Sequence, residues 1–304
     1  MDIIEIKNKR VLVTGGEGYL GGYLINKLIN LGAEVYSIDI KETSQNGKVK
    51  YFKVNLNDER ELFKIIKEVN PELIYHLAAS LDRTRDFSEA NTIYSINLNG
   101  TVNLLNALKS INYSNFVFIS TSEVYGGEET QSPISEESKF IPASPYSLSK
   151  CFAELTLQTF SKINQKHFTI LRVFNFFGPK MPDGFFISQL ITKLENNQDF
   201  DMTKGEQSRD YLYIDDITDA LILASSQKAY DEIFNVCSGK GISIKDIALR
   251  FKKITNSKSK INFGAIPYRE NEIWDMTGDN SKINQFLGWK PRLTIFDRYK
   301  RNNL

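Results

Sequence analysis

Tyr146 and Lys150 lie four residues apart in the segment "SPYSLSKCFAELTLQTF", where apolar residues at 152, 155 and 160 predict a helix. Residues at i and i+4 share one face of a helix, so the phenol and the ammonium are expected to face the same space. A phenol titrates near pH ~10 in water, and a neighbouring ammonium lowers that value. The pair therefore predicts a general base that takes the proton of an alcohol while hydride leaves the same carbon.

A second polar group, "STSEVYG", directly follows an apolar run at 116–119. It places Thr121, Ser122 and Glu123 where a buried strand is expected to end. A carboxylate there can remove an acidic carbon-bound proton. The alternative is a structural role, in which Glu123 caps a nearby backbone N–H. All three residues are candidate catalytic groups.

A glycine-rich turn, "TGGEGYLGG", places Gly15, Gly18 and Gly21 between a predicted strand and a predicted helix. Such glycines let the backbone approach a pyrophosphate at a helix N-terminus. Asp39 follows about 20 residues later and can accept hydrogen bonds from both ribose hydroxyls of an adenosine. Lys41 keeps NADP open, but the carboxylate favours NAD. Alone, neither this turn nor the Tyr–Lys spacing is specific, and together they predict a dinucleotide-dependent oxidoreductase.

The elements that position these residues alternate between short apolar runs and amphipathic segments of helix length. Helices are expected at 19–32, 58–69 and 94–110. Strands are expected at 10–14, 34–38, 49–54, 73–78, 116–120, 168–173 and 232–238. Regular strand–helix alternation predicts an α/β fold with a doubly wound parallel sheet of the Rossmann type.

The later part of the chain predicts a smaller C-terminal lobe that binds substrate. Residues 1–174 are expected to form the NAD-binding domain, which also receives segments near 210–240. Residues 175–304 are expected to form most of the discontinuous second lobe. Asp215 or Asp216 is expected to cap a helix, and "LGWKP" predicts a helix end.

Composition excludes several classes of function. The 304 residues are 41% hydrophobic and 25% charged, with a net charge of +1 and no basic cluster that would favour nucleic acid or an anionic membrane. Two cysteines, Cys151 and Cys237, have no spacing typical of a disulfide framework or a metal site. No apolar run reaches the roughly 18 residues of a membrane span. We expect a cytoplasmic protein with no metal, nucleic-acid or membrane partner.

The motifs also occur in an order that identifies a family resemblance. In sequence they are "TGGEGYLG", "HLAA", "NLNGT", "STSEVYG", "PYSLSK", "RVFNFFGP", "RDYLYIDD" and "LGWKP". The chain resembles the extended short-chain dehydrogenases/reductases, in particular the NAD-dependent epimerase/dehydratase group that acts on nucleotide-diphosphate sugars. The resemblance covers nearly the whole chain.

The resemblance implies roles for individual residues. Lys150 would also bind the nicotinamide ribose, and Thr121 would hydrogen-bond the reacting sugar hydroxyl beside Tyr146. Asn175, Arg209 and Arg269 would hold the nucleotide diphosphate, whereas Arg83 would either contact the substrate or lie on a solvated loop. Further residues expected near NAD are Tyr19, Leu20, Ile40, Asn55, Leu56, Leu77, Ala78, Ala79, Asn97, Ser120 and Phe174. Asn55 departs from the Asp that similar sequences often carry.

The same resemblance leaves the outcome of the reaction open. If C4 of the sugar is oxidised and hydride then returns to the opposite face, the enzyme is a 4-epimerase. If the ketone is released, or the step runs backward on a ketone, the enzyme is a 4-dehydrogenase or 4-keto reductase. Loss of the C5 proton to Glu123, with expulsion of the C6 hydroxyl, gives a 4,6-dehydratase, and loss of carbon dioxide from a uronate gives a decarboxylase. Many dehydratases carry Asp where this chain has Ser122, but the GDP-mannose dehydratases and the UDP-glucuronate decarboxylases resemble it with Thr-Ser-Glu. The downstream segment "MTKGEQSRDYLYIDD" is more similar to epimerases and 4-keto-sugar reductases of the group. A non-catalytic NAD-sensing protein is the alternative from another class.

An assembly is also expected. The segments "NGTVNLLNALKS" and "CFAELTLQTF" carry more apolar surface than one face of a sheet needs. In similar proteins the two helices pair across a two-fold axis, which implies a homodimer joined by a four-helix bundle.

Overall fold

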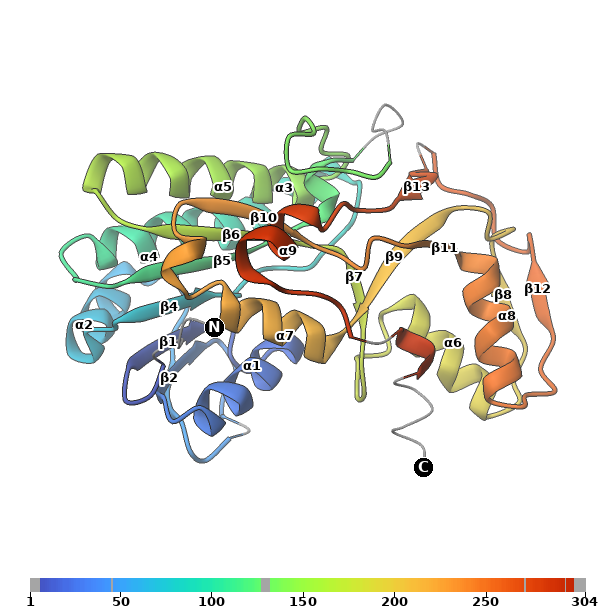
Figure 1. Ribbon diagram of the computed structural model, residues 1–304, viewed down its shortest axis with the longest axis horizontal. Helices are drawn as coiled ribbons and strands as arrows, with labels where there is room; N and C mark the ends of the chain where they lie inside the picture. The colour runs from blue at the N-terminus through green and yellow to red at the C-terminus, as the bar shows by residue number, and fades with distance from the viewer. Residues whose placement is uncertain (1–5, 45, 127–131, 271, 293, 298–304) are drawn as a thin grey trace.

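A parallel sheet of seven strands forms the larger part of the computed structural model, which describes residues 6–44, 46–126, 132–270, 272–292 and 294–297. The strand order is β10-β6-β5-β4-β1-β2-β3 (Figure 1). The strands are β1 (Arg10–Thr14), β2 (Glu34–Asp39), β3 (Lys50–Lys53), β4 (Leu73–His76), β5 (Asn115–Thr121), β6 (Phe168–Val173) and β10 (Glu232–Val236). The predicted strands and the doubly wound Rossmann-type sheet are confirmed, with strand ends shifted by at most two residues.

Helices cover both faces of this sheet. On one face lie α1 (Tyr19–Asn30), α7 (Ile214–Leu223) and α9 (Ser281–Leu287); on the other lie α2 (Glu59–Val69), α4 (Gly100–Leu108) and α5 (Pro145–Asn164). Strand residues alternate between the two layers, so Val11 and Val13 pack with the first set and Leu12 with the second. Continuous apolar strands therefore serve two separate cores, as expected for a sheet buried on both faces.

Local sequence explains where several helices begin and end. Asp58 caps α2 by accepting a 3.1 Å hydrogen bond from the backbone of Glu61, and the helix ends at Asn70 in a left-handed conformation. Ser144 forms a capping box with Ser147 at the start of α5, with Pro145 in the first turn. The segment predicted as one helix at 94–110 is instead α3 (Ala90–Tyr94), a π-helical stretch (Ser95–Asn99) and α4.

The expected cap of α7 is wrong. The helix begins after Tyr213, with no capping bond from a described side chain. Asp216 is instead buried and accepts 3.2 Å hydrogen bonds from both the backbone N–H and the Nε of Arg292. Its carbonyl accepts a 2.9 Å bond from the indole of Trp289. The carboxylate therefore fastens the segment after α9, which ends at Gly288 as "LGWKP" predicted.

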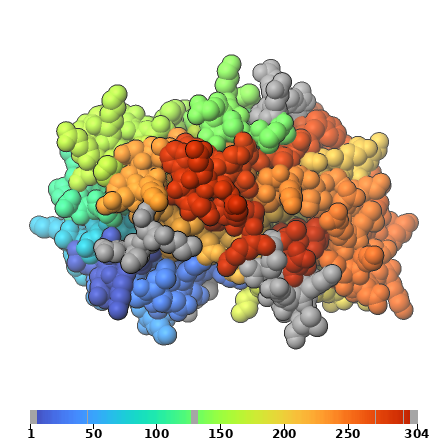
Figure 2. Space-filling view, in the orientation of Figure 1, coloured from blue at the N-terminus to red at the C-terminus, as the bar shows by residue number. Residues whose placement is uncertain are grey.

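A second, smaller group of elements packs beside the sheet, with the red C-terminal segment lying across the middle of the face in Figure 2. The short strands β7 (Asn175–Phe177), β9 (Ser208–Tyr213), β11 (Gly241–Ser243) and β13 (Asp275–Met276) form one sheet, and β8 (Phe200–Met202) pairs with β12 (Ile261–Phe263). Helices α6 (Phe186–Glu195) and α8 (Ile244–Ile254) build a separate apolar core with them. Within the described part of the chain, no helix has the length and apolar character of a membrane span.

Two residues of α8 test the packing of this second core. Ile247 is fully buried, whereas Leu249, two positions along the same helix, is 43% exposed. Ile247→Ala should lower the free energy of unfolding by about 2–5 kcal/mol, because a cavity replaces the side chain. Leu249→Ala should change it by less than about 1 kcal/mol. Urea unfolding followed by circular dichroism measures both, and equal losses would contradict this packing.

Candidate active site

Backbone segments approach one another closely at the carboxyl ends of β1 and β4. Gly15 has a φ of +70°, and a Cβ there would lie 2.7 Å from the backbone nitrogen of Ala78, which follows β4. A Cβ on Gly21 would overlap the carbonyl oxygen of Gly15. Helix α1 begins after Gly18 with no hydrogen bond from a described side chain to its first amides. These N–H groups and the helix dipole fit the pyrophosphate of a dinucleotide.

Asp39 connects this turn to the end of β2. Its Oδ2 accepts a 3.0 Å hydrogen bond from the backbone of Glu17, and its Oδ1 accepts a 2.8 Å bond from that of Ile40. The Ile40 side chain is 68% exposed beside this carboxylate. The Lys41 ammonium donates to the carbonyl of Glu17 and is thereby committed to the protein. This arrangement fits a ribose diol better than a 2′-phosphate.

Other residues expected around the dinucleotide lie directly after β4 and at the start of α1. Leu77, Ala78 and Ala79 follow β4, and the Ala78 N–H donates to the Thr14 hydroxyl at 3.3 Å. Tyr19 opens α1, and its hydroxyl donates to the carbonyl of Pro179 at 3.1 Å. The next residue of α1, Leu20, packs against the core between that helix and the sheet.

The region where the adenine is expected to bind is more exposed than the glycine turn. Asn55 is exposed and its side chain accepts a 3.0 Å hydrogen bond from the backbone of Asn57. Leu56 is buried and lies against Gly100 at the start of α4. Asp58 serves as the cap of α2, so it does not replace the Asp that similar sequences carry at position 55.

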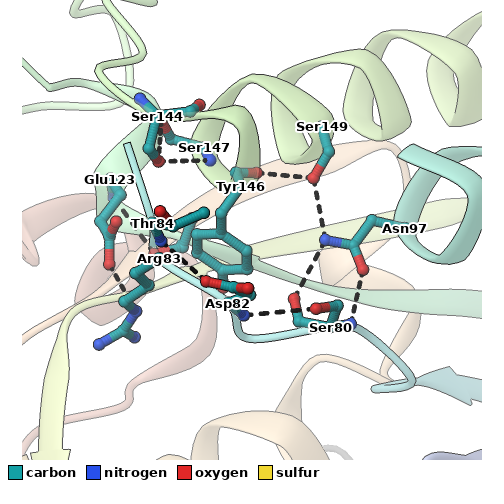
Figure 3. A network of polar contacts seen from close by, with 11 residues as sticks. Ser80, Asp82, Arg83, Thr84, Asn97, Glu123, Ser144, Tyr146, Ser147 and Ser149 are labelled. Carbon is teal, nitrogen blue, oxygen red and sulfur yellow. Dashed lines mark hydrogen bonds and ion pairs between the residues drawn. The ribbon is translucent and has the colours of Figure 1, made fainter. Parts of the chain in front are cut away.

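Asn97 joins the loop after β4 to α5 by hydrogen bonds. Its Oδ1 accepts a 2.7 Å bond from the backbone of Ser80, and its Nδ2 donates to the Ser80 carbonyl at 3.1 Å and to the Ser149 hydroxyl at 2.9 Å (Figure 3). The residue lies in the π-helical stretch, where the backbone leaves α-helical spacing. These bonds fix the loop after β4 against α5.

His76 extends this polar support into the sheet. One ring nitrogen lies 2.6 Å from the Thr14 hydroxyl and the other lies 2.9 Å from that of Thr101, which donates to the carbonyl of Asn97 at 2.7 Å. Burial lowers the pKa of His76 to about 3, and the nearby Lys150 charge adds to the decrease. The ring is therefore neutral and structural.

The stretch that follows β5 divides into buried and accessible groups. The Ser120 hydroxyl donates to the buried carboxylate of Glu154 and so faces the protein interior. Thr121 caps a short 3-10 turn (Ser122–Val124) by accepting a 3.2 Å bond from the backbone of Glu123. Ser122 is buried, whereas the Glu123 side chain is partly exposed. Of Ser122 and Glu123, only Glu123 has a side chain that solvent reaches.

A buried ion pair lies behind this stretch, and sequence reasoning missed it. Arg172 pairs with Glu154 at 2.8 Å, and both side chains are almost fully buried. Arg172 also donates to the Tyr125 hydroxyl at 2.9 Å, which donates to Asn235 at 2.6 Å. The signal was a single charge within the otherwise apolar strand 168–173, a position that needs a buried partner.

Tyr146 lies buried at the start of α5, between Thr121 and a pair of charges. Arg83 donates from Nε to Glu123 at 2.9 Å, and its guanidinium carbon lies 5.7 Å from the centre of the Tyr146 ring (Figure 3). Burial raises the pKa of Tyr146 to about 12, and the Glu123 charge adds to the rise. The Arg83 charge and hydrogen bonds from Thr121 and Arg83 oppose it.

Lys150 is not among the groups that act most strongly on the pKa of this phenol, so its expected acidifying effect stays a prediction for the NAD-bound protein. The Lys150 ammonium donates a 2.8 Å hydrogen bond to the carbonyl of Ile119 and lies 4.6 Å from the centre of the Phe118 ring. Burial lowers its pKa to about 8, which the Glu154 charge opposes. Spacing of four residues places both groups on one side of α5, but the cation that acts on the phenol comes from the loop after β4.

The residues expected to contact the substrate lie in the second lobe, and they differ in how strongly their side chains are held by neighbours. Asn175 pairs with Tyr211 across β7 and β9. Arg209 is paired with Glu272 at 2.6 Å and donates to the Ile273 carbonyl at 2.6 Å. Arg269 is exposed on the segment between β12 and β13. The Phe174 ring is buried in an apolar cluster with Tyr125, so its side chain supports the site from behind.

The neutral His76 predicts a specific acid sensitivity. Its folded pKa of about 3 lies below the unfolded value, so the unfolded chain binds one more proton as pH falls. Stability is fully present above pH ~6.5 and should decrease by about 1.4 kcal/mol per pH unit toward pH ~3. Urea titrations across that range should show a shallower slope for His76→Gln. His167 lies outside this buried network, so His167→Gln is the comparison variant for loss of a histidine.

Comparisons with known proteins agree with this geometry. The family model described as GDP-mannose 4,6 dehydratase matches residues 12–301. A putative UDP-glucose 4-epimerase of Methanocaldococcus jannaschii is 30% identical over 96% of both chains. The crystal structure of UDP-glucose 4-epimerase from Thermotoga maritima with UDP-glucose has a TM-score of 0.89 at 25% identity, covering 97% of this chain and 99% of that one.

A further solved structure is MoeE5 in complex with UDP-glucuronic acid and NAD. It has a TM-score of 0.86 at 25% identity, covering 97% of this chain and 99% of that one. Together with the glycine turn and the Tyr146–Lys150 helix, these matches place the chain in the GDP-mannose 4,6-dehydratase family of extended short-chain dehydrogenases/reductases.

Proposed function

We propose that the protein is an NAD-dependent enzyme that oxidises C4 of a nucleotide-diphosphate sugar and returns hydride to the other face, as a 4-epimerase does. The observation that carries this proposal is the buried Tyr146 phenol near Thr121, at the edge of the sheet where the glycine turn opens. The relatives named above, which include 4-epimerases, support the same reaction class.

NAD is the cofactor that these residues fit. Gly15, Gly18 and Gly21 would admit the pyrophosphate, and Asp39 would accept the ribose hydroxyls. The Lys41 ammonium, held by the carbonyl of Glu17, is not placed to neutralise a 2′-phosphate. MoeE5, a structural neighbour, was solved with NAD. When bound, the cofactor would accept hydride from C4 and give it back.

The chain's own residues would handle the proton. Tyr146 as phenolate would take the proton of the C4 hydroxyl, and Thr121 would hold the oxygen that carries it. Lys150 would donate to the nicotinamide ribose, and the positive charge of the oxidised ring would oppose the rise in the Tyr146 pKa that burial causes. The partly exposed Arg83 guanidinium supplies a second positive charge on the solvent side.

The second lobe would hold the nucleotide diphosphate. We keep the division into an NAD-binding part, residues 1–174 with segments near 210–240, and a mostly substrate-binding part, residues 175–304. Arg269 is exposed and can move toward a phosphate. Arg209 would have to break its ion pair with Glu272, or bind Glu272 and the phosphate at the same time. Asn175 would contact the substrate from the end of β7. We place the protein in the cytoplasm, which its two free cysteines support.

Dehydration is the second candidate, because the matching family model is described as a dehydratase. Glu123 would then remove the C5 proton. One feature weighs against it: Glu123 is engaged by Arg83 at 2.9 Å. Ser122 does not decide the question, because the Thr-Ser-Glu order resembles the GDP-mannose dehydratases. A non-catalytic NAD sensor would have no need of a buried phenol hydrogen-bonded to a threonine.

Tyr146→Phe tests the proposed base. Turnover of a nucleotide sugar should fall by about 10²–10⁴-fold, since the general base is lost. NAD affinity, measured by calorimetry, should stay within about threefold. Incubation with UDP-, GDP-, dTDP- and CDP-sugars, followed by mass spectrometry and NMR, identifies the product. An epimer of unchanged mass supports the proposal, loss of water supports the dehydratase, and no reaction supports the sensor.

We also propose a homodimer formed by α4, α5 and their partner copies. On α5, Phe152 is 39% exposed and Leu155 is 51% exposed, with Ile96 of the preceding π-helical stretch 38% exposed. An apolar groove on this face is lined by Leu98, Phe152, Leu155 and Phe160. Such a patch on a helix face is typical of a subunit interface.

Light scattering at micromolar concentration tests this assembly. The unchanged chain should give about twice the mass of one chain, and Leu155→Asp should give one chain, because a charge enters the apolar contact. Leu249→Asp, on the exposed face of α8, is the matched control and should remain dimeric. A monomer for the unchanged chain would exclude the bundle.

A further inference from the structure

We propose that Arg83 is a positioning residue of this chemistry: by pairing with Glu123 beside Tyr146, it prevents the carboxylate from taking the sugar's C5 proton. The sugar therefore keeps its C5 hydrogen and its C6 hydroxyl. This inference rests on the proposed function and decides between its two outcomes.

The first argument is the place of the guanidinium. Arg83 lies on the loop after β4, which Asn97 fixes against α5 through its bonds to Ser80 and Ser149. Its guanidinium carbon lies near two aromatic rings, 5.7 Å from the centre of Tyr146 and 5.8 Å from that of Phe185. A cation that contacts two ring faces and a carboxylate is restrained in direction.

The second argument is the state of the carboxylate. Glu123 Oε1 accepts the Nε–H of Arg83 at 2.9 Å, and the Glu123 side chain is 29% exposed. The hydrogen bond to Arg83 occupies this oxygen and fixes its direction. The oxygen would have to leave Arg83 before it could approach C5. The pair thus keeps Glu123 out of the position that a general base for C5 requires.

The chemistry that the pair suppresses is defined. In the 4-keto sugar the C5–H bond is weakened by the adjacent ketone. A free Glu123 would take that proton, and the electron pair would move on to the C4 oxygen. Return of a proton from solvent to C5 would exchange the C5 hydrogen. Dehydration would follow if the electron pair instead formed a C5–C6 double bond while the C6 hydroxyl took the proton from Glu123 and left as water. With the pair intact, only hydride transfer and proton transfer through Tyr146 proceed.

Arg83 has a second, electrostatic consequence for the phenol. The charged and polar groups that act most strongly on Tyr146 are Glu123 from the 3-10 turn, Arg83 from the loop after β4 and Thr121 from β5. Lys150 lies one turn along α5, and Tyr211 of β9 interacts with Arg83. Glu123 raises the pKa of Tyr146 and Arg83 lowers it. Removal of Arg83 should thus shift the pH profile of activity upward, and removal of the Glu123 charge should shift it downward.

The experiment uses NAD-loaded, full-length protein with UDP-glucose as the first probe in D₂O. The label at C5 of recovered sugar is measured by NMR, which separates it from label at C3. The unchanged chain should turn over sugar with no C5 label. Arg83→Met should incorporate C5 deuterium at a rate at least about tenfold higher. The double variant Arg83→Met/Glu123→Gln should again show no C5 deuterium. Arg83→Lys, which keeps a positive charge, should incorporate much less C5 deuterium than Arg83→Met.

A pH profile of hydride transfer gives an independent reading. The midpoint should rise by about one unit in Arg83→Met and fall by a similar amount in Glu123→Gln. Arg85→Met is the matched control on the same loop, because the Arg85 guanidinium donates to the backbone of Glu270. It should leave both the midpoint and the label unchanged.

Several results would overturn the inference. C5 label in the unchanged chain means that Glu123 already acts as a base. An Arg83→Met protein that transfers hydride, gains no C5 label and shows only a raised KM means that Arg83 binds substrate instead. If no nucleotide sugar of the panel is turned over by the unchanged chain, the proposed function itself fails, and the role of Arg83 falls with it.

Discussion

The phenol of Tyr146 is buried, and burial opposes the phenolate that C4 oxidation needs. A pKa raised to about 12 leaves a small fraction ionised near neutral pH, so positive charge must come from outside the helix that carries the residue. In this chain the loop after β4 brings Arg83 to within 5.7 Å of the ring, and Thr121 at the end of β5 adds a hydrogen bond. The fold is arranged so that three separate elements meet at that oxygen.

Their meeting depends on polar groups buried behind the site. Asn97 joins the loop after β4 to α5, and the neutral His76 joins β1 to the π-helical stretch through two threonines. Glu154 and Arg172 form a buried pair that also takes the hydroxyl of Ser120. Breaking one member of such a network leaves another unpaired in a low-dielectric interior, which is costly. The network thus holds the loop after β4, α5 and the strand ends in place around the site.

Family membership and mechanism rest on different residues. The glycine turn, Asp39 and the Tyr146–Lys150 helix are what the chain has in common with the motif pattern of the extended short-chain dehydrogenases/reductases. In our proposal the fate of the 4-keto sugar depends on Glu123, and the structure shows this carboxylate paired with Arg83 at 2.9 Å. A family model described as a dehydratase therefore coexists with a proposed epimerase, because fold and cofactor do not fix the ending of the reaction.

The sequence by itself determined the parallel sheet, the cofactor turn and the helix with Tyr146 and Lys150, because strand periodicity, glycine spacing and i,i+4 spacing are local properties. It did not reveal that Asp216 clamps the C-terminal segment, that Arg172 pairs with Glu154, or that Lys150 is directed to the carbonyl of Ile119. Nor did it place Arg83 against Glu123, 40 residues away in the chain. Those contacts join elements distant in sequence, and their electrostatics depend on burial, which only tertiary packing decides.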